Sequence, residues 1–285
     1  MLASERELSE RRVSMKSSPC VVIAGAGDVG SRLAALRALR GDEVIALRRR
    51  DVQTGVGIRA VQADLATGDG LKQLPRQPDA LVFCAAPDER NEAAYRALYL
   101  DGLRRLLDAC DAGRVIFVSS TAVYAEDAGE WVNEATPTRP LAFNGRALLD
   151  AEHVLDAHVQ AVVLRLSGLY GPGRDAMLRR ARTGEGNRPH WSNRLHVDDA
   201  ASALSCLLDL VALERRYLGS DDCPARECDI QNWLREREAL PELPSKPGVD
   251  SGRRVCNKLL RAAGWLPRYP DFRAGYAPLL APAGV

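Results

Sequence analysis

The residues with the clearest chemical meaning are three glycines, Gly25, Gly27 and Gly30, which follow the spacing GxGxxG. In that spacing the first glycine permits a tight turn, the second lets the backbone approach a pyrophosphate, and the third lets a helix pack against a strand. The phosphates then lie at the helix N-terminus, where backbone N–H groups have no partner within the helix. The loop, which also contains Asp28 and Val29, is therefore predicted to bind a dinucleotide.

The sequence around the glycines supplies the elements that this use of the motif needs. Cys20–Ala24 is an apolar run, too short for a helix and rich in valine and isoleucine, as in a buried parallel strand. Leu33, Leu36 and Leu39 then recur on one face of a helix, and residues 43–47 form a second strand. In this strand–turn–helix context the motif is a strong indicator, although a glycine-rich turn without a ligand stays the alternative.

The second strand ends in three arginines, Arg48, Arg49 and Arg50. An acidic residue there would accept hydrogen bonds from the ribose 2′-hydroxyl of NAD and repel the 2′-phosphate of NADP. Guanidinium groups instead match a phosphate in charge and in geometry. Arg48 therefore predicts binding of NADP in preference to NAD, with a solvated strand end as the alternative explanation.

Four further strand-like runs alternate with helical segments along the chain: 57–62, 80–85, 114–119 and 161–166. Such alternation predicts an α/β protein with a doubly wound parallel sheet and helices on both faces. Asp64 and Leu65 follow the third strand, where the adenine is expected. The segment "CAAP" (84–87), with Ala85 and Ala86, ends the fourth strand above the expected cofactor, where small side chains let a dinucleotide lie close.

The composition argues against several classes of function. With 39 Lys plus Arg against 38 Asp plus Glu, the net charge of +1 provides no field for nucleic acid or an anionic membrane. No run approaches the roughly 18 apolar residues of a membrane helix. The seven scattered cysteines are typical of a reducing compartment, so a cytoplasmic location is expected. Cys223 and Cys228 lack a second ligand pair, and no metal site is predicted.

Three segments give the chain a resemblance to a known family: "FVSSTAVY" (117–124), "LRLSGLYGPGR" (164–174) and "NRLHVDDAASAL" (193–204). They resemble the extended short-chain dehydrogenase/reductases, the NAD-dependent epimerase/dehydratase family. The resemblance implies a Rossmann domain with a smaller C-terminal lobe that grips a nucleotide sugar. We therefore expect a polar tail (1–18), an NAD(P)-binding Rossmann domain (19–170) and a region that is mainly substrate lobe with returning sheet elements (171–285).

The resemblance also implies roles for single residues. Ser120 matches the hydroxyl residue that hydrogen-bonds the reacting oxygen, and Ser167 and Gly168 belong to the loop beside the nicotinamide. Contacts to a small-molecule substrate are expected from three residues: Thr121, Arg174 and His196. For His196 a partly buried histidine packed under the lobe stays an open alternative.

Members of the family with redox activity carry YxxxK on the helix after the "SSxxVY" strand, and this chain lacks both residues. In the family the lysine lowers the pKa of the phenol from about 10, so that the phenol exchanges a proton near neutral pH. Aligning the family's helix glutamate on Glu152 places Asn144 at the tyrosine and Leu148 at the lysine. A shift by one residue places Phe143 and Ala147 there instead, and neither alignment restores a phenol or an ammonium group. The chain therefore resembles the atypical members of the superfamily, which keep the cofactor fold and lose the YxxxK pair.

Tyr124 is the leading candidate for a replacement acid, because it carries a phenol and lies near the substrate side in the family. Arg146, Tyr170 and His196 are weaker candidates. The leading hypothesis is an NAD(P)-binding, epimerase/dehydratase-like oxidoreductase that acts on a nucleotide-sugar-like or other small substrate. The alternative is a non-catalytic NADP(H)-sensing regulatory or binding protein, and a third possibility is an interaction scaffold without a ligand.

Helices are expected in four of the remaining segments: 92–110, 139–158, 175–182 and 252–264. The third would belong to a loop-rich part of the lobe. The first two are the long helices through which proteins of this fold commonly pair, so a homodimer is possible.

Overall fold

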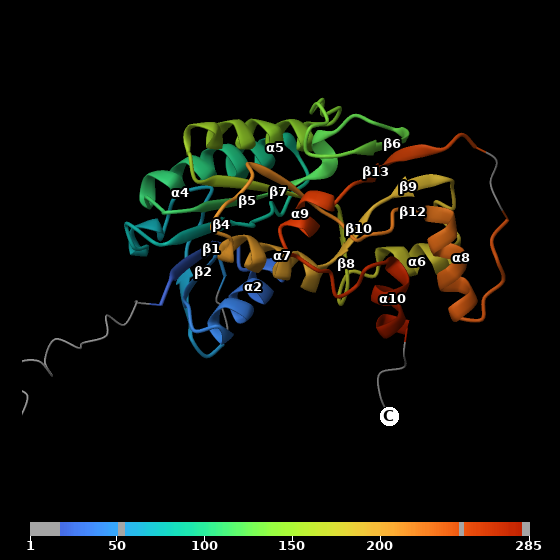
Figure 1. Cartoon of the computed structure of the whole chain (residues 1–285), viewed down its shortest axis with the longest axis horizontal. Coiled ribbons are helices and arrows are strands. Elements are labelled where there is room, and N and C mark those ends of the chain that lie inside the picture. Colours follow the sequence, from blue (N-terminus) through green and yellow to red (C-terminus); the bar gives the residue numbers. More distant parts are fainter. Residues whose placement is uncertain (1–17, 51–54, 245–247, 281–285) are drawn as a thin grey trace, which may run out of the picture.

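A computed structural model describes residues 18–50, 55–244 and 248–280, so the predicted polar tail lies outside the described residues except for Ser18. Seven parallel strands form the large sheet, in the order β11-β7-β5-β4-β1-β2-β3 (Figure 1). Their bounds are β1 Cys20–Ala24, β2 Glu43–Arg48, β3 Ile58–Gln62, β4 Ala80–Phe83, β5 Val115–Ser120, β7 Ala161–Leu166 and β11 Arg216–Gly219. The predicted α/β fold with a doubly wound parallel sheet is confirmed.

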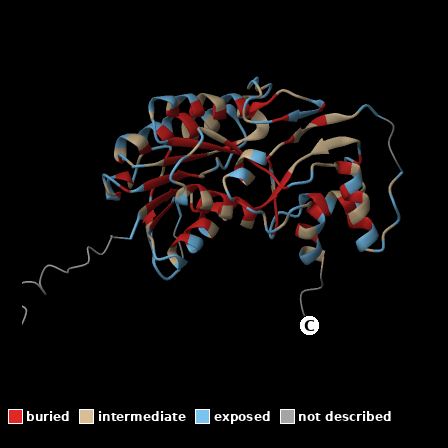
Figure 2. Cartoon of the chain, in the orientation of Figure 1, coloured by how far each residue is buried: buried red, intermediate tan, exposed pale blue. Residues whose placement is uncertain are grey.

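Helices cover both faces of this sheet, because its strands carry apolar side chains on both sides. In Figure 1, α4 and α5 lie above the sheet and α2 and α7 below it. The helix bounds are α2 Asp28–Leu39, α3 Glu92–Arg96, α4 Leu103–Ala109, α5 Phe143–Val154 and α7 Val197–Asp209. All six residues of β7 are buried, and Figure 2 shows the strands as the buried centre of the molecule. Within the described ranges, no helix is long and apolar enough to cross a membrane.

The strand order reverses between β1 and β4. On one side of this point lie β2 and β3, and on the other lie β5, β7 and β11. Because the connections from the two strands leave in opposite directions, a crevice opens at their carboxyl ends, where α/β proteins bind ligands. The backbone N–H of Cys84 donates to the carbonyl of Ala24 at 2.9 Å, which holds the loops after β4 and β1 side by side.

A smaller lobe lies to the right of the large sheet in Figure 1. It contains a four-stranded sheet in the order β12-β9-β13-β6, and a two-stranded sheet, β10-β8, lies between it and the large sheet. The strand bounds are β6 Ala128–Val132, β8 Gly168–Tyr170, β9 His190–Ser192, β10 Arg194–His196, β12 Ala225–Arg226 and β13 Ser251–Val255. The remaining helices are α6 Ala176–Thr183, α8 Glu227–Arg237, α9 Lys258–Ala262 and α10 Phe272–Leu280. Strand β6 joins this lobe from the first part of the chain, whereas β11 and α7 return to the large sheet.

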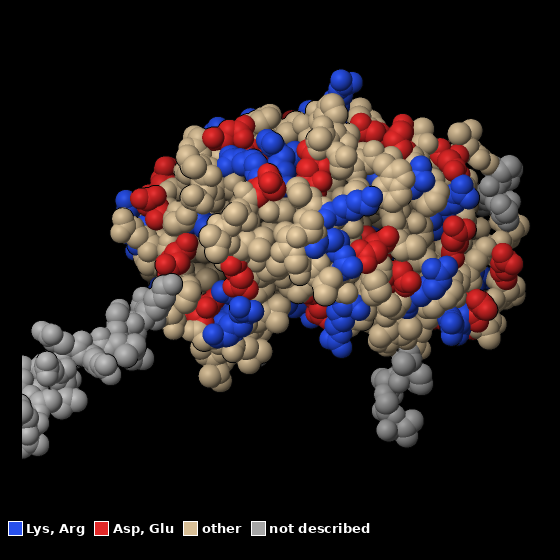
Figure 3. Space-filling model, in the orientation of Figure 1, with Lys and Arg blue, Asp and Glu red and all other residues tan. Residues whose placement is uncertain are grey.

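Charged side chains on the lobe are largely paired with one another. Arg180 lies 3.3 Å from Glu227, and Arg182 forms a two-pronged pair with Glu238. On the face of the molecule in Figure 3, basic and acidic side chains are interspersed. Neither sign of charge therefore dominates that face, as the near-zero net charge requires.

Two of the expected helices differ from the structure. Residues 252–264 do not form one helix: Ser251–Val255 is strand β13, and only Lys258–Ala262 is helical. Gly252 has a φ of +78°, which no right-handed helix allows, and pairing with β6 and β9 holds the segment extended. The helix expected from 139 begins at Phe143, because residues before proline are pushed out of the helical region and Pro140 follows Arg139 directly.

Candidate functional site

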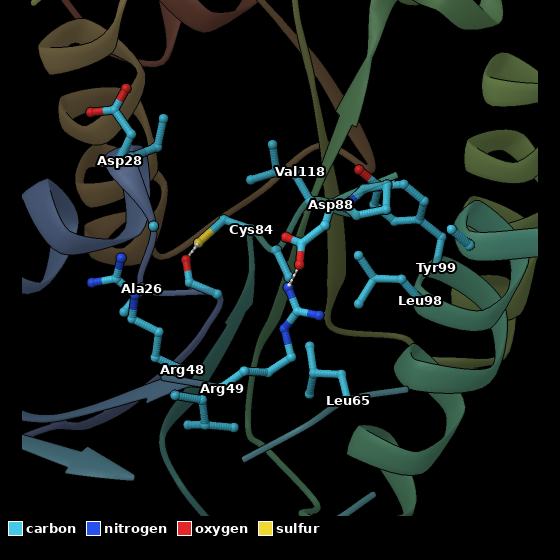
Figure 4. A pocket seen from close by; sticks show the side chains of 18 of the residues that line it. Ala26, Asp28, Arg48, Arg49, Leu65, Cys84, Asp88, Leu98, Tyr99 and Val118 are labelled. Atoms are coloured by element: carbon cyan, nitrogen blue, oxygen red, sulfur yellow. Dashed lines mark hydrogen bonds and ion pairs between the residues drawn. The ribbon is translucent and has the colours of Figure 1, made fainter. Parts of the chain in front are cut away.

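A pocket of about 630 Å³ lies along the carboxyl ends of β1, β2, β4 and β5, at the reversal of the strand order. Most of the predicted site residues line it: Gly25, Gly27, Asp28, Val29, Arg48, Asp64, Leu65, Ala85, Ala86, Ser120, Ser167 and Arg174. The predicted residues that do not line it are Gly30, Gly168, Thr121, Tyr124 and His196. Figure 4 shows the glycine loop and Arg48 on one side of this pocket, facing Leu98 and Tyr99 on the other.

The three glycines meet the requirements of a pyrophosphate-binding turn. Gly25 has a φ of +99°, and a Cβ there would lie 2.3 Å from the backbone of Ala85. A Cβ at Gly30 would lie 2.3 Å from the carbonyl oxygen of Gly25, so this glycine packs the helix on the turn instead of facing the pocket. A Cβ at Gly27 would meet nothing within 4 Å, and no side chain caps the first N–H groups of α2. These residues fit the phosphates of a dinucleotide.

Two arginines neutralise the acidic residue of this loop. Arg174 lies 2.7 Å from Asp28 and Arg32 lies 3.1 Å from it, while Arg32 also contacts Asp198 at 2.7 Å. Partial burial alone would raise the pKa of Asp28, but the hydrogen bonds from Arg174 and Arg32 outweigh it and lower that pKa. The ion pair with Asp28 therefore links Arg174, which follows β8, to the glycine loop, and Arg174 is part of the pocket lining.

Three arginines, Arg48, Arg49 and Arg50, line the pocket at the end of β2, together with three acidic residues, Asp64, Asp88 and Glu89. Arg48 is the last residue of β2 and, within the described ranges, forms no ion pair. The neighbouring Arg49 pairs instead with Asp88 after β4, and its hydrogen bond lowers the pKa of that carboxyl. The carboxylate of Asp64 accepts a hydrogen bond from the backbone N–H of Ala66 at 2.8 Å, and this bond stabilises the turn after β3.

The inner end of the pocket is largely apolar, since Val118, Leu148, Leu166 and Leu169 line it. Leu148 is the residue aligned with the family's lysine, and it presents only hydrocarbon to the ligand space. The hydroxyl oxygen of Ser120 accepts the N–H of Ala122 at 3.2 Å, so its own proton stays free to be donated into the pocket.

The start of helix α5 packs closely on neighbouring elements. A Cβ at Gly145 would lie 2.3 Å from the carbonyl oxygen of Ala122, so the third residue of α5 packs tightly on the turn after β5. Phe143 stacks edge-on against Tyr95 at 5.3 Å, and neither Phe143 nor Asn144 lines the pocket. The helix therefore offers no phenol to the site.

Tyr124 is buried behind the site, with 1% of its surface exposed. Its hydroxyl donates to the carbonyl of Asn133 at 3.0 Å and accepts from Arg165 at 2.7 Å. Burial raises the pKa of the Tyr124 phenol, even though Arg165 opposes the shift. The Tyr124 hydroxyl is therefore engaged on both sides and does not face the pocket, which is unfavourable for the proton-donor role expected from the sequence.

His196 and Thr121 also support the backbone around the site without lining the pocket. His196 is 2% exposed, accepts the N–H of Asp198 at 3.2 Å at the start of α7, and stacks on Tyr269. Burial lowers the pKa of this imidazole, so it is the packed, neutral histidine of the alternative explanation. The carbonyl of Thr121 accepts a hydrogen bond from Arg253 at 2.8 Å, which ties β13 to the turn after β5.

Two large pocket side chains could not be assigned from the sequence. Leu98 and Tyr99 line the pocket from a π-helical turn, Ala97–Gly102, which interrupts the helical segment between α3 and α4. Ordinary helical periodicity does not reveal such a turn. The thiol of Cys84 donates to the carbonyl of Gly25 at 3.3 Å, and its burial raises its pKa to about 12. This thiol therefore stays protonated and serves the loop structurally.

A glycine-rich turn between β1 and α2, opening onto a pocket where the strand order reverses, defines a Rossmann-type dinucleotide-binding protein. The chain belongs to the NAD-dependent epimerase/dehydratase family, whose sequence pattern matches residues 20–217.

Individual relatives agree with this assignment. Protein YeeZ of Escherichia coli is 30% identical over 273 residues, which cover 88% of this chain and 96% of that protein. The dTDP-4-dehydrorhamnose reductase of Mycobacterium tuberculosis is 28% identical over 214 residues, 68% of this chain and 67% of that enzyme. A solved structure from Methylobacillus flagellatus, assigned to the NAD-dependent epimerase/dehydratases, is 36% identical, with a TM-score of 0.82 over 93% of this chain and 98% of that chain.

Proposed function

We propose that this protein is an NADP-dependent oxidoreductase that acts on a nucleotide-sugar-like substrate without the family's tyrosine–lysine pair. The observation that carries the proposal is the single pocket that joins three features. These are a glycine loop without a side-chain cap, Arg48, which forms no ion pair with any described residue, and Ser120 at the inner end.

Different residues along the pocket contact the cofactor and the substrate. The N–H groups at the start of α2 hold the pyrophosphate, and Arg48 binds the 2′-phosphate. When bound, the nicotinamide supplies or accepts a hydride. The hydroxyl of Ser120 donates a hydrogen bond to the reacting oxygen of the substrate, and the apolar side chains of Val118, Leu148 and Leu166 keep water away from it.

The substrate class rests on the relatives and on the place of the lobe. The M. tuberculosis relative is named for a deoxythymidine diphosphate sugar, and the smaller lobe of this chain lies beside the large sheet (Figure 1). Arg174 reaches from that lobe to the phosphate-binding loop. A substrate that carries a diphosphate suits this arrangement, since guanidinium groups bind phosphate oxygens well.

The alternative function, a protein that senses NADP(H) without turnover, is favoured by one specific observation. Leu148, which the alignment on Glu152 matches to the family's lysine, is an apolar residue of the pocket wall, and Tyr124 is buried and does not line the pocket. Both proposals share the same cofactor site, so binding must be tested before chemistry.

Calorimetric titration of the protein with NADPH and with NADH tests the cofactor assignment. We expect tighter binding of NADPH, and Arg48→Ala should remove about 10-fold or more of that preference while leaving NADH binding unchanged. Arg59→Ala, on the exposed side of β3, is the matched control. Equal binding of the two dinucleotides by the wild-type protein would refute the preference for NADP.

Substrate turnover separates the two functions. Reduction of a 4-keto nucleotide sugar by NADPH in the wild-type protein would support the enzyme. If turnover appears only in the double variant Asn144→Tyr with Leu148→Lys, the native protein is a binding protein that has lost the chemistry of its family.

A cytoplasmic location and a homodimer through α4 and α5 are also proposals. All seven cysteines are free, as in a reducing compartment. Light scattering of the purified protein measures the oligomeric state directly, and a mass near 31.0 kDa would exclude the dimer.

A further inference from the structure

The π-helical turn Ala97–Gly102 places a phenol on the pocket wall. Tyr99 is the only tyrosine among the described residues that lines the pocket. It lies next to Leu98 on the side opposite the glycine loop (Figure 4). Short π-helical turns occur frequently at functional sites, because the extra residue rotates one side chain out of the regular helical pattern.

The surroundings of Tyr99 account for its ring but not for its hydroxyl. The ring packs among Tyr95, Phe83 and Phe117, with centroid distances of 5.5, 6.2 and 6.1 Å. The side chain is 8% exposed, and its hydroxyl makes no hydrogen bond to any residue within the described ranges. A phenylalanine would fill the same space, so packing alone does not account for the hydroxyl.

Around Tyr99 the pocket is lined by Leu98 and Leu148, whereas its serines, Ser119, Ser120 and Ser167, come from the ends of β5 and β7. Leu148 stands at the position from which the family's lysine contacts the ribose of the nicotinamide half, and it offers neither a donor nor an acceptor. Leu148 and Tyr99 belong to the same hydrophobic cluster and line the same pocket. Burial raises the pKa of Tyr99, so its phenol is neutral at physiological pH and can both donate and accept.

We propose that the hydroxyl of Tyr99 hydrogen-bonds the ribose of the nicotinamide half of the cofactor, the contact that Leu148 cannot make. This inference rests on the proposed dinucleotide binding, and it assigns to Tyr99 a positioning role. The cofactor would then be oriented by a neutral side chain from the π-helical turn in place of a cation from α5. The ribose would be held without a positive charge beside the nicotinamide.

Calorimetry with ligands of increasing length tests the contact. The ligands are 2′,5′-ADP, which ends before the second ribose; 2′-phospho-ADP-ribose, which includes that ribose; and NADPH. Tyr99→Phe should weaken binding of the two longer ligands by about 3- to 10-fold, the range for one neutral hydrogen bond, and leave 2′,5′-ADP unchanged. Tyr95→Phe is the matched control, because Tyr95 lies four residues earlier on the same helical segment and does not line the pocket.

Each other outcome has a separate meaning. Equal weakening of all three ligands by Tyr99→Phe would overturn the proposal, since it would show a general disturbance of the pocket. Weakening of NADPH alone would also overturn it, because the contact would then be to the nicotinamide or beyond. If the wild-type protein binds none of the three ligands and no NADH, the proposed function itself fails, and thermal melting of both variants shows whether they remain folded.

Discussion

The carboxylate of Glu152 accepts two hydrogen bonds from the guanidinium group of Arg165, at 3.0 and 2.6 Å, and both side chains are almost fully buried. The hydroxyl of Ser119 donates to the same carboxylate at 2.6 Å. This pair ties α5 to β7 directly behind the site. If one partner of such a buried ion pair is removed, the other charge stays buried without compensation, and this strongly lowers the stability of the fold.

Removing one partner of this pair should therefore be severe. Glu152→Gln leaves the charge of Arg165 buried without compensation, and we expect a loss of about 3–5 kcal/mol in the free energy of unfolding, measured by urea denaturation. The apolar double variant Glu152→Leu with Arg165→Met should recover part of that loss. Asp150→Asn, which breaks an exposed pair with Arg96 at 3.4 Å, should cost less than about 1 kcal/mol.

Substitutions of two glycines in the loop should have different effects, one on cofactor binding and the other on stability. Gly27→Ala directs a methyl group into open space at the phosphate position, so cofactor affinity should fall at least about 10-fold while the melting temperature stays close to that of the wild type. Gly25→Ala forces a side chain onto a residue with a φ of +99° and against Ala85, and should cost about 2 kcal/mol or more in stability. Equal stability of the two variants would contradict this assignment.

Arg174 should affect dinucleotide binding through Asp28. In Arg174→Ala the carboxylate of Asp28 keeps only Arg32 as a partner and stands beside the bound pyrophosphate. We expect NADPH affinity to fall about 5- to 10-fold at low salt and by less at high salt, where the repulsion is screened. The control is Arg179→Ala, an exposed arginine on α6 paired with Asp175, and it should bind NADPH as the wild type does.

Asp221 should make stability depend on pH. Its side chain is buried, and one of its oxygens has no hydrogen-bond partner among the described residues, so burial raises its pKa to about 8. Between about pH 4 and pH 8 the unfolded chain has lost this proton and the folded protein retains it, so stability falls as the pH rises. Asp221→Asn should reduce that fall by at least about 1 kcal/mol in denaturation at pH 5 and pH 8. The exposed Asp101→Asn should leave it unchanged, and parallel pH profiles of all three proteins would refute the assignment.

The layout of the large sheet and the cofactor loop could be predicted because both follow from local patterns. Apolar runs of four to six residues, separated by helical periodicity, fix parallel strands, and the glycine spacing fixes the turn. Arg48, Ala85 and Ser120 all line the pocket for the same reason. Arg48 and Ser120 end a strand and Ala85 lies two residues after one, and parallel strands end at one edge of the sheet.

The sequence-based predictions that differ from the structure concern residues whose environment depends on partners far away in the sequence. Tyr124 could not be recognised as buried without knowing that Arg165, 41 residues later, would meet its hydroxyl. The arginine itself gave a hint, since a charge inside the apolar run 161–166 requires a buried partner. Strand β13 was mistaken for helix because its extended form depends on pairing with β6, and the π-helical turn that presents Tyr99 leaves no periodic signal.

The pairing of β13 with β6 has a consequence for how the protein is made. Arg253 donates to the carbonyl of Glu126 at 2.7 Å across 127 positions of the chain. During synthesis β6 therefore has no partner strand until residues near 255 have left the ribosome. Strands β1 to β5, in contrast, pair with strands that are near in the sequence and can form early. The lobe should consequently be the last part of the molecule to mature. A chain cut short before residue 251 would retain the nucleotide-binding strands but expose an open strand edge that invites aggregation.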